Sequence, residues 1–365
     1  MGPEGGITWA HAESLAFASL LTEGVPIRLT GQDVERGTFS QRHLVLHDYG
    51  EGEIWSPKTG RTYAPIANLM RASAAIELHN SPLSEAATVG FEYGYSTEAP
   101  ETLVLWEAQY GDFANGAQIM VDQFIVSGRV KWGERSRLTL LLPHGYEGNG
   151  PEHSSARIER YLQAAAEDNI RVANLSTAAQ YFHLLRKQAL SDKQRPLIIF
   201  TPKSMLRMKV ASSTLEELAT GHFEAVIDDP VGSASAADRM AVKRLILCTG
   251  KIAHELEGDE RRRNRPNLAI VRVELLYPYP EDEIRGIIAS YPNLERITWV
   301  QEEPRNMGAW EHMQRELSRT LPHGVRLEYV GRPRRASPSE GYPKAHQTEQ
   351  ERLVAAALAG GSATA

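Results

Sequence analysis

The chain of 365 residues is 42% hydrophobic and 24% charged, a balance typical of a globular protein with about two domains. Its formal net charge of −6 and scattered basic residues argue against a nucleic-acid-binding protein, and no apolar run approaches the ~20 residues that a transmembrane helix needs. The single cysteine, Cys248, excludes a disulfide framework and a cysteine zinc site, and we expect a reducing, cytoplasmic location.

Short apolar strands alternate with longer helices over the first 201 residues. Helical periodicity and apolar runs together predict helices over 9–22, 84–95, 116–127, 157–167 and 177–190, and strands over 26–29, 102–106, 138–142, 171–175 and 197–201. The polar segment 33–43 lacks periodicity and is predicted to be a loop. This alternation is typical of a parallel sheet that helices cover on both faces.

The pattern loosens after residue 201 and then resumes. It predicts strands over 244–248, 269–275, 296–301 and 326–330, and helices from 252, over 281–290, over 308–320 and within the Ala-rich tail 350–365. We therefore predict an α/β fold with two doubly wound, mainly parallel-sheet domains. The first spans residues 1–205, a linker spans 206–222, and the second domain spans 223–365.

The most informative segment runs from Leu142 to Arg160 and reads LPHGYEGNGPEHSSARIER. It follows a predicted strand directly and contains two histidines, His144 and His153. Open α/β sheets place ligand chemistry in loops that leave the carboxyl ends of their strands. A solvated turn with two incidental histidines explains the spacing equally well.

Glu85 lies just inside a predicted helix, among the small residues Ala86, Ala87, Val89 and Gly90. A carboxylate in such surroundings is expected to be desolvated, which raises its pKa toward values that suit proton exchange. The local sequence alone favours a simpler role, in which a first-turn acid complements the helix dipole.

The segment from Glu107 to Phe113 (EAQYGDF) follows another predicted strand. It places an acid, an amide and an aromatic ring at the edge of the sheet, although a loop whose Phe113 simply packs is the alternative. The sequence contains no GxxxxGK[ST] loop, no strand–GxGxxG–helix fingerprint and no HxxEH motif, so a standard nucleotide site has no support.

Six long segments together carry a family resemblance. In chain order they read RLTGQDVERGTFSQRH, NSPLSEAATVGFEYGYS, LVLWEAQYGDFANGAQIMVDQFI, LLLPHGYEGNGPEHSSARIERYLQ, QYFHLLRKQ and LIIFTPKSMLR. The chain resembles the thiamine-diphosphate-dependent, decarboxylating component of 2-oxoglutarate dehydrogenase. The resemblance weakens after Leu218 and returns at YVGRPRRASPSEG. It implies a transketolase-like pyrimidine-binding domain followed by a transketolase-like carboxy-terminal domain.

The resemblance also implies a role for five residues. Glu85 matches the glutamate that hydrogen-bonds a ring nitrogen of the cofactor's aminopyrimidine and favours the imino tautomer, which removes the thiazolium proton. Phe113 matches the aromatic ring stacked on the pyrimidine, Gln109 is a polar neighbour of that ring, and Leu83 offers its backbone to it. His153 matches the histidine that faces the substrate, where it would transfer a proton or pass the acyl group to the lipoyl arm. It ranks above His144, which is more often a loop or supporting residue.

The family's diphosphate motif, a GDG followed by an Asn, is not found in this sequence. The resemblance therefore implies that a diphosphate-binding domain or subunit outside this sequence holds the diphosphate and its Mg²⁺, and no metal ligand is expected here. It further implies a homo-oligomer or hetero-oligomer, and a lipoyl-bearing succinyltransferase component as partner.

Three functions stay open. The first is oxidative decarboxylation of 2-oxoglutarate with succinyl transfer to lipoyl groups in the tricarboxylic acid cycle, with this chain supplying the aminopyrimidine half of the site. The second is a non-catalytic assembly subunit or fragment of a 2-oxo acid dehydrogenase complex, which the missing diphosphate motif favours. The third is the second subunit of a pyruvate or branched-chain 2-oxo acid dehydrogenase. By resemblance, RGTFSQRH and PHGYEGNGPEHSSAR favour 2-oxoglutarate.

Overall fold

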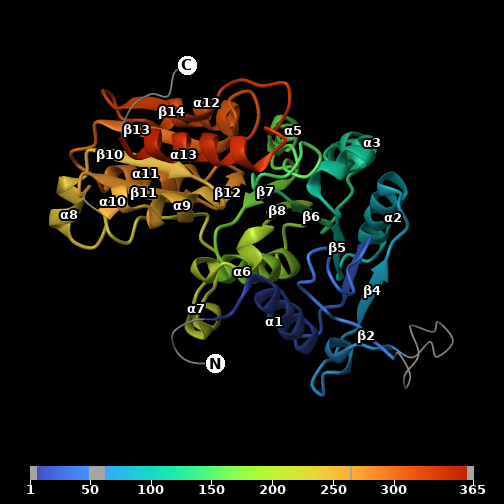
Figure 1. Ribbon diagram of the computed structural model, residues 1–365. Coiled ribbons are helices and arrows are strands. Elements are labelled where there is room, and N and C mark those ends of the chain that lie inside the picture. The colour runs from blue at the N-terminus through green and yellow to red at the C-terminus, as the bar shows by residue number, and fades with distance from the viewer. Residues whose placement is uncertain (1–5, 49–61, 264, 360–365) are drawn as a thin grey trace.

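Two mainly parallel β-sheets form the centre of the molecule (Figure 1). The structure is a computed structural model and describes residues 6–48, 62–263 and 265–359. The first sheet contains β1 (Ile27–Gly31), β4 (Ile76–Asn80), β5 (Leu103–Glu107), β6 (Thr139–Pro143), β7 (Arg171–Asn174), β8 (Leu197–Thr201) and β12 (Leu275–Tyr277). Their order is β12-β7-β8-β6-β5-β1-β4, and each neighbouring pair is parallel except β12 with β7. The predicted α/β class is confirmed.

The second sheet lies at the upper left of Figure 1. It contains β9 (Val226–Ile227), β10 (Arg244–Cys248), β11 (Leu268–Val273), β13 (Arg296–Pro304) and β14 (Arg326–Arg332). The order is β14-β13-β10-β11-β9, with only β9 antiparallel to its neighbour. A separate antiparallel pair is formed by β2 (Leu46–His47) and β3 (Thr62–Tyr63).

The first sheet is covered on both faces by α1 (Trp9–Thr22), α6 (Ala178–Leu190), α2 (Glu85–Glu98) and α5 (Ile158–Ala164). Successive strand residues point to opposite faces, so a strand buried at every position needs helices on both sides. All five residues of β5 are buried. Leu105 belongs to the apolar cluster of α1 and α6, whereas Trp106 belongs to that of α2 and α5.

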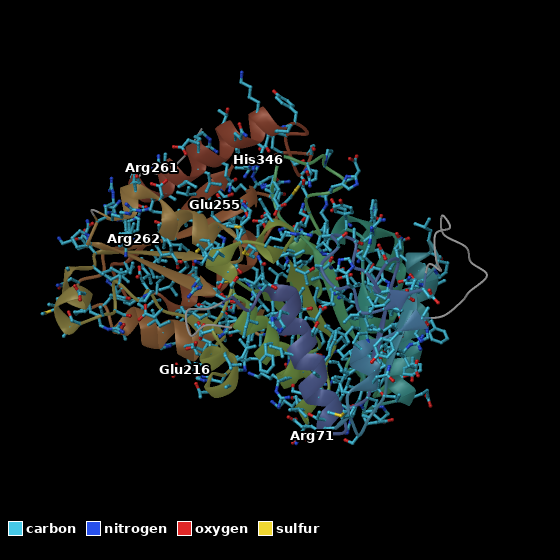
Figure 2. All side chains as sticks on the ribbon, turned by 60° about the horizontal axis from the view of Figure 1, so that its bottom comes forward. Arg71, Glu216, Glu255, Arg261, Arg262 and His346 are labelled. Carbon is cyan, nitrogen blue, oxygen red and sulfur yellow. The ribbon has the colours of Figure 1, made fainter. Side chains whose placement is uncertain are left out.

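The second sheet is covered in the same way by α9 (Ile252–Gly258), α13 (Pro343–Ala359), α11 (Glu281–Ala289) and α12 (Trp310–Thr320). Cys248 packs in the cluster of α9 and α13, so it is a buried core thiol, and burial raises its pKa. Figure 2 shows Glu255 of α9 and His346 of α13 on this side of the sheet. The connections contain the shorter helices α3 (Gln118–Met120), α4 (Gly128–Trp132), α7 (Leu215–Thr220), α8 (Ala236–Ala241) and α10 (Glu260–Arg263).

The prediction of one continuous helix over 116–127 is wrong. The chain forms a 3₁₀ helix over Gly111–Ala117, then α3, then a π-helical turn over Val121–Ile125. The changes of helical pitch alter which side chains face inward. Ile125 is buried, but Ile119 is 61% exposed and Phe124 is 37% exposed, so the apolar residues do not share one buried face.

The strand predicted over 269–275 is two strands that belong to different sheets. β11 ends at Val273, and the chain then crosses over so that β12 pairs antiparallel with β7 of the first sheet. Leu276 of β12 is fully buried in an apolar cluster that contains residues of both sheets. The two sheets therefore share a continuous core. The division of the chain at 206–222 stays a prediction, and that segment includes α7.

The edge strand β4 is absent from the sequence prediction. Its five residues are each intermediate or exposed and none is buried, so no apolar run marks it. The loop predicted over 33–43 is confirmed as a series of turns. The end of the Ala-rich tail, residues 360–365, lies outside the described residues, and the rest of the tail belongs to α13.

A buried arginine ties the loop after β1 to the first sheet. The Arg42 guanidinium donates to Glu13 Oε2 of α1 at 3.0 Å and to Glu107 Oε1 of β5 at 2.7 Å. The three side chains are at most 6% exposed. Burial by itself lowers the pKa of Arg42, but the two carboxylates raise it well above its usual value.

We predict that Arg42→Met lowers the free energy of unfolding by about 3–5 kcal/mol, because it leaves two carboxylates buried without their cation. Urea denaturation measures the change. Arg36→Met is the matched control, since the Arg36 side chain in the same loop is 53% exposed, and its effect should stay within about 0.5 kcal/mol. Equal effects of the two substitutions would contradict the role given to Arg42.

Candidate active site

The candidate residues gather at the carboxyl edge of the first sheet. Gln32 directly follows β1, Gln109 lies two residues beyond β5, His144 directly follows β6, and Lys203 lies two residues beyond β8. Glu85 opens α2, which follows the edge strand β4. Because parallel strands all end at the same edge, segments far apart in sequence meet there.

Glu85 is half-buried at this edge. Its Oε1 accepts a hydrogen bond from Gln32 Nε2 at 3.1 Å. A Cβ added to Gly116 would lie 3.1 Å from Glu85 Oε2, so the glycine lets the chain pass close to the carboxylate. The expected desolvated surroundings are incomplete in the described structure, because Glu85 is only half-buried and Leu83 nearby is 82% exposed.

His153 lies in a cluster of aromatic rings. Its ring centroid is 4.5 Å from that of Tyr110 and 5.8 Å from that of Phe113, both edge-on. Phe39, from the loop after β1, contacts Tyr110 at 5.4 Å. The 3₁₀ helix that contains Phe113 also contains Gly116, so this short helix connects the ring cluster to Glu85.

Phe113, His153 and Glu85 therefore lie along one edge. Gln109 is half-buried at the same edge. Within the described parts of the chain, no hydrogen bond or ring contact joins Gln109 or Leu83 to the other three.

The backbone of the loop around His153 is held by side chains from three strand ends. Lys203 Nζ donates to the His153 carbonyl at 2.5 Å. Asp112 Oδ1 accepts from the amides of Ser154 and Ser155 at 3.3 and 3.1 Å. His144 Nδ1 accepts from the Ala156 amide at 3.1 Å. Four consecutive residues, 153–156, thus each have a backbone group bound by a side chain.

His144 also joins this loop to the second sheet. Since its Nδ1 accepts from Ala156, the neutral ring carries its proton on Nε2, which donates to Glu303 Oε1 of β13 at 2.7 Å. Both side chains are at most 6% exposed. Burial raises the pKa of Glu303, but the hydrogen bond from His144 and nearby positive charge outweigh it, so the pKa is lowered overall.

Further contacts hold the first part of the loop. The Arg332 guanidinium lies 5.0 Å from the ring centroid of the buried Tyr146. Glu147 Oε1 accepts from the amide and hydroxyl of Ser204, at 2.9 and 2.6 Å. A solvated turn does not fit these contacts, so that reading of the segment is wrong.

Four residues of this region escaped the sequence prediction as individual site residues: Gln32, Tyr110, Asp112 and Lys203. Lys203 offered the clearest signal, because it follows a predicted buried strand just as His144 does. Asp112 and Tyr110 lie inside the segment EAQYGDF that was singled out, but nothing local indicates that they contact residues 153–155.

Two kinds of feature are not found in the described ranges. Among residues 6–48, 62–263 and 265–359, no group of three or more His, Cys, Asp or Glu side chains could hold a metal ion. In the same ranges, no helix combines the length and the apolar character that a membrane crossing requires.

Comparison with known proteins shows the family of this chain. Residues 5–209 match the family model of the transketolase pyrimidine-binding domain. The chain belongs to this family. Residues 212–358 match the 2-oxoglutarate dehydrogenase C-terminal model. Together the two matches confirm the resemblance found in the sequence and the transketolase-like character of the fold.

Several curated relatives are similar over 97% of the chain. The 2-oxoglutarate dehydrogenase E1 component of Geobacillus kaustophilus (strain HTA426) is 56% identical over 358 residues. Those of Geobacillus sp. (strain WCH70) and Bacillus cereus (strain AH820) are 55% and 54% identical. The chain spans only 36–37% of the length of these relatives, so most of each relative has no counterpart in this sequence.

We predict that Glu303→Gln lowers the free energy of unfolding by about 1–3 kcal/mol at neutral pH, because the bond to His144 loses its charge. The folded pKa of Glu303 is below its ordinary value of 4.5, so its contribution is present above that pH and is lost as the pH falls through the folded pKa. Urea denaturation at several pH values should show the difference from wild type shrinking below pH 4.5.

Glu311→Gln is the control, since the Glu311 side chain is 69% exposed. A stability difference for Glu303→Gln that stays constant or grows on acidification would contradict the assignment.

Proposed function

We propose that this chain supplies the aminopyrimidine-binding half of a thiamine diphosphate site in the decarboxylating component of 2-oxoglutarate dehydrogenase. The observation that carries the proposal is the placement of Glu85, Phe113 and His153 along one sheet edge, connected by the 3₁₀ helix Gly111–Ala117. The family membership and the names of the relatives support it independently.

The residues present fit the pyrimidine end of this cofactor. An aminopyrimidine offers ring nitrogens, an exocyclic amine and an aromatic face. Here a half-buried carboxylate, a half-buried amide and a half-buried aromatic ring are available in Glu85, Gln109 and Phe113. Gly116 lets the 3₁₀ helix approach the Glu85 carboxylate closely, since a Cβ there would lie 3.1 Å from Oε2.

Thiamine diphosphate, when bound, supplies the carbon nucleophile and the electron sink for decarboxylation of a 2-oxo acid. Glu85 would then hold or move a proton at a pyrimidine nitrogen. Phe113 would orient the ring by stacking, with Gln109 and the Leu83 backbone as further contacts. His153 would exchange a proton with the substrate or its acyl product.

The exposed apolar residues near Glu85 support a further domain or subunit over this edge. Leu83 is 82% exposed, and Phe91 of α2 and Ile119 of α3 are each 61% exposed. Apolar surface of this kind usually marks an interface. We propose that the diphosphate-binding part, which would also hold Mg²⁺, covers it in an oligomer, and that the lipoyl succinyltransferase component accepts the acyl group. Covering the edge would also desolvate Glu85.

We predict that Glu85→Ala in the complete protein lowers kcat for 2-oxoglutarate by at least ~100-fold, a loss expected when a group that moves a proton is removed. Steady-state turnover and thermal unfolding are measured together, and the melting temperature should change little because Glu85 is half-buried. Glu98→Ala, at the exposed end of the same helix, is the control. Turnover of Glu85→Ala at the wild-type rate would disprove the assignment.

A second prediction separates the half-site from a non-catalytic subunit. If the chain contributes only the pyrimidine side, the isolated chain should bind thiamine and thiamine diphosphate with affinities within ~3-fold, since the charged end finds no partner here. The complete protein should bind the diphosphate form with Mg²⁺ at least ~100-fold more tightly than thiamine. Calorimetric titration checks both.

Two outcomes would count against the half-site. Strong selection of the diphosphate by the isolated chain would show that it holds that end itself. No binding of either compound, by the chain or by the complete protein, would favour the assembly role.

A further inference from the structure

Two charged residues hold neighbouring backbone groups of one peptide segment. The Lys203 ammonium binds the carbonyl of His153, and the Asp112 carboxylate binds the next two amides, those of Ser154 and Ser155. A cation on a carbonyl and an anion on the following amides both stabilise this segment, and charge-assisted hydrogen bonds are about twice as strong as neutral ones. We propose that Lys203 and Asp112 are positioning residues that fix His153 for its role in the proposed function.

Lys203 is in an unusual setting for a lysine. It is 5% exposed, and burial lowers its pKa, although the charges of Glu147, Asp112 and Glu302 partly oppose this. Within the described ranges no carboxylate lies within 4.0 Å of its ammonium to form an ion pair, and its hydrogen bond goes to a neutral carbonyl. Burying a cation in this way lowers the stability of the fold, and burying an apolar side chain of similar length would lower it less. Stability alone therefore gives no reason for a lysine here.

Asp112 has a similar feature. Its Oδ1 binds the two amides, but its Oδ2 is buried without a hydrogen-bond partner in the described structure. Burial raises the pKa of this carboxyl, although the two amides partly oppose the rise. A buried carboxylate oxygen without a hydrogen-bond partner lowers the stability of the fold. Asp112 nevertheless lies where its other oxygen binds the two residues that follow His153.

The same short segment also contacts the His153 side chain. Tyr110 and Phe113 flank Asp112 in sequence, and both rings meet the imidazole edge-on. Residues 110–113 thus restrain the ring of His153, while Asp112 restrains the backbone after it and Lys203 restrains its own carbonyl. Together they define both the position and the orientation of the imidazole, as a proton-transfer residue requires.

The test uses Lys203→Met and Asp112→Asn, two variants of nearly unchanged size. Hydrogen exchange of the amides of Ser154–Ala156 in the chain should become ~10-fold to ~100-fold faster in each, because a charge-assisted bond is lost or weakened. Lys209→Met, an exposed lysine near the same strand end, is the control. Unchanged exchange in both variants would overturn the proposal, and Asp112→Asn keeps the test valid should Lys203→Met fail to fold.

A double-mutant cycle in the complete protein then distinguishes positioning from general support. Lys203→Met should lower kcat at least ~10-fold with a smaller change in KM, and adding it to His153→Ala should have no further effect. If the losses of kcat add in the double variant, the positioning role is overturned and the proposed role of His153 is not. If His153→Ala itself keeps wild-type turnover, the proposed role of His153 fails and the positioning role fails with it, whatever the exchange rates show.

Discussion

The imidazole of His144 is the contact on which the arrangement of this site depends. One ring nitrogen accepts from the amide of Ala156, and the other donates to Glu303 of the second sheet. The first bond closes the loop that contains His153, and the second ties that loop to β13. Making both bonds requires the tautomer with a bare Nδ1 and a hydrogen on Nε2, so the tautomer of His144 and the loop conformation are linked. The two sheets are therefore coupled at the candidate site, as well as through the shared core around β12.

The second constraint is that the candidate site is open to solvent on one side. The groups that would meet a pyrimidine ring lie along an open edge, with Glu85 half-buried and Leu83 exposed. Desolvation of Glu85 would have to come from elsewhere. The chain spans little more than a third of the length of its relatives. In the proposal, the part of the protein outside this sequence both covers the open edge and binds the diphosphate.

Much of this architecture could be predicted from the sequence because its central strands are continuous apolar runs. β6 and β10 are buried at every position, and a strand can be buried in this way only when helices cover both faces of its sheet. β12 could not be predicted, because three residues that follow a strand of the other sheet carry no separate signal. The 3₁₀ helix before α3 was also missed, and its Gly111 packs closely against Ala156 and Pro143, contacts between distant segments that local patterns do not report.

The candidate site was predicted unevenly. The loop with His144 and His153 stood out from local composition, whereas Glu85 and Phe113 were assigned mainly by resemblance. Lys203 and His153 are 50 residues apart, and Asp112 and Ser154 are 42 apart. Contacts at such separations are set by the order of strands in the sheet, which local patterns do not report.

The central claim is that Glu85, Phe113 and His153 face one bound thiamine diphosphate. The most direct test is a crystal structure of the complete protein with this cofactor. We expect a Glu85 carboxylate oxygen within hydrogen-bonding distance of a pyrimidine nitrogen, Phe113 against the ring, and the loop 144–156 held as it is here. A cofactor bound away from this sheet edge, or a Glu85 side chain that stays in solvent beside it, would contradict the account.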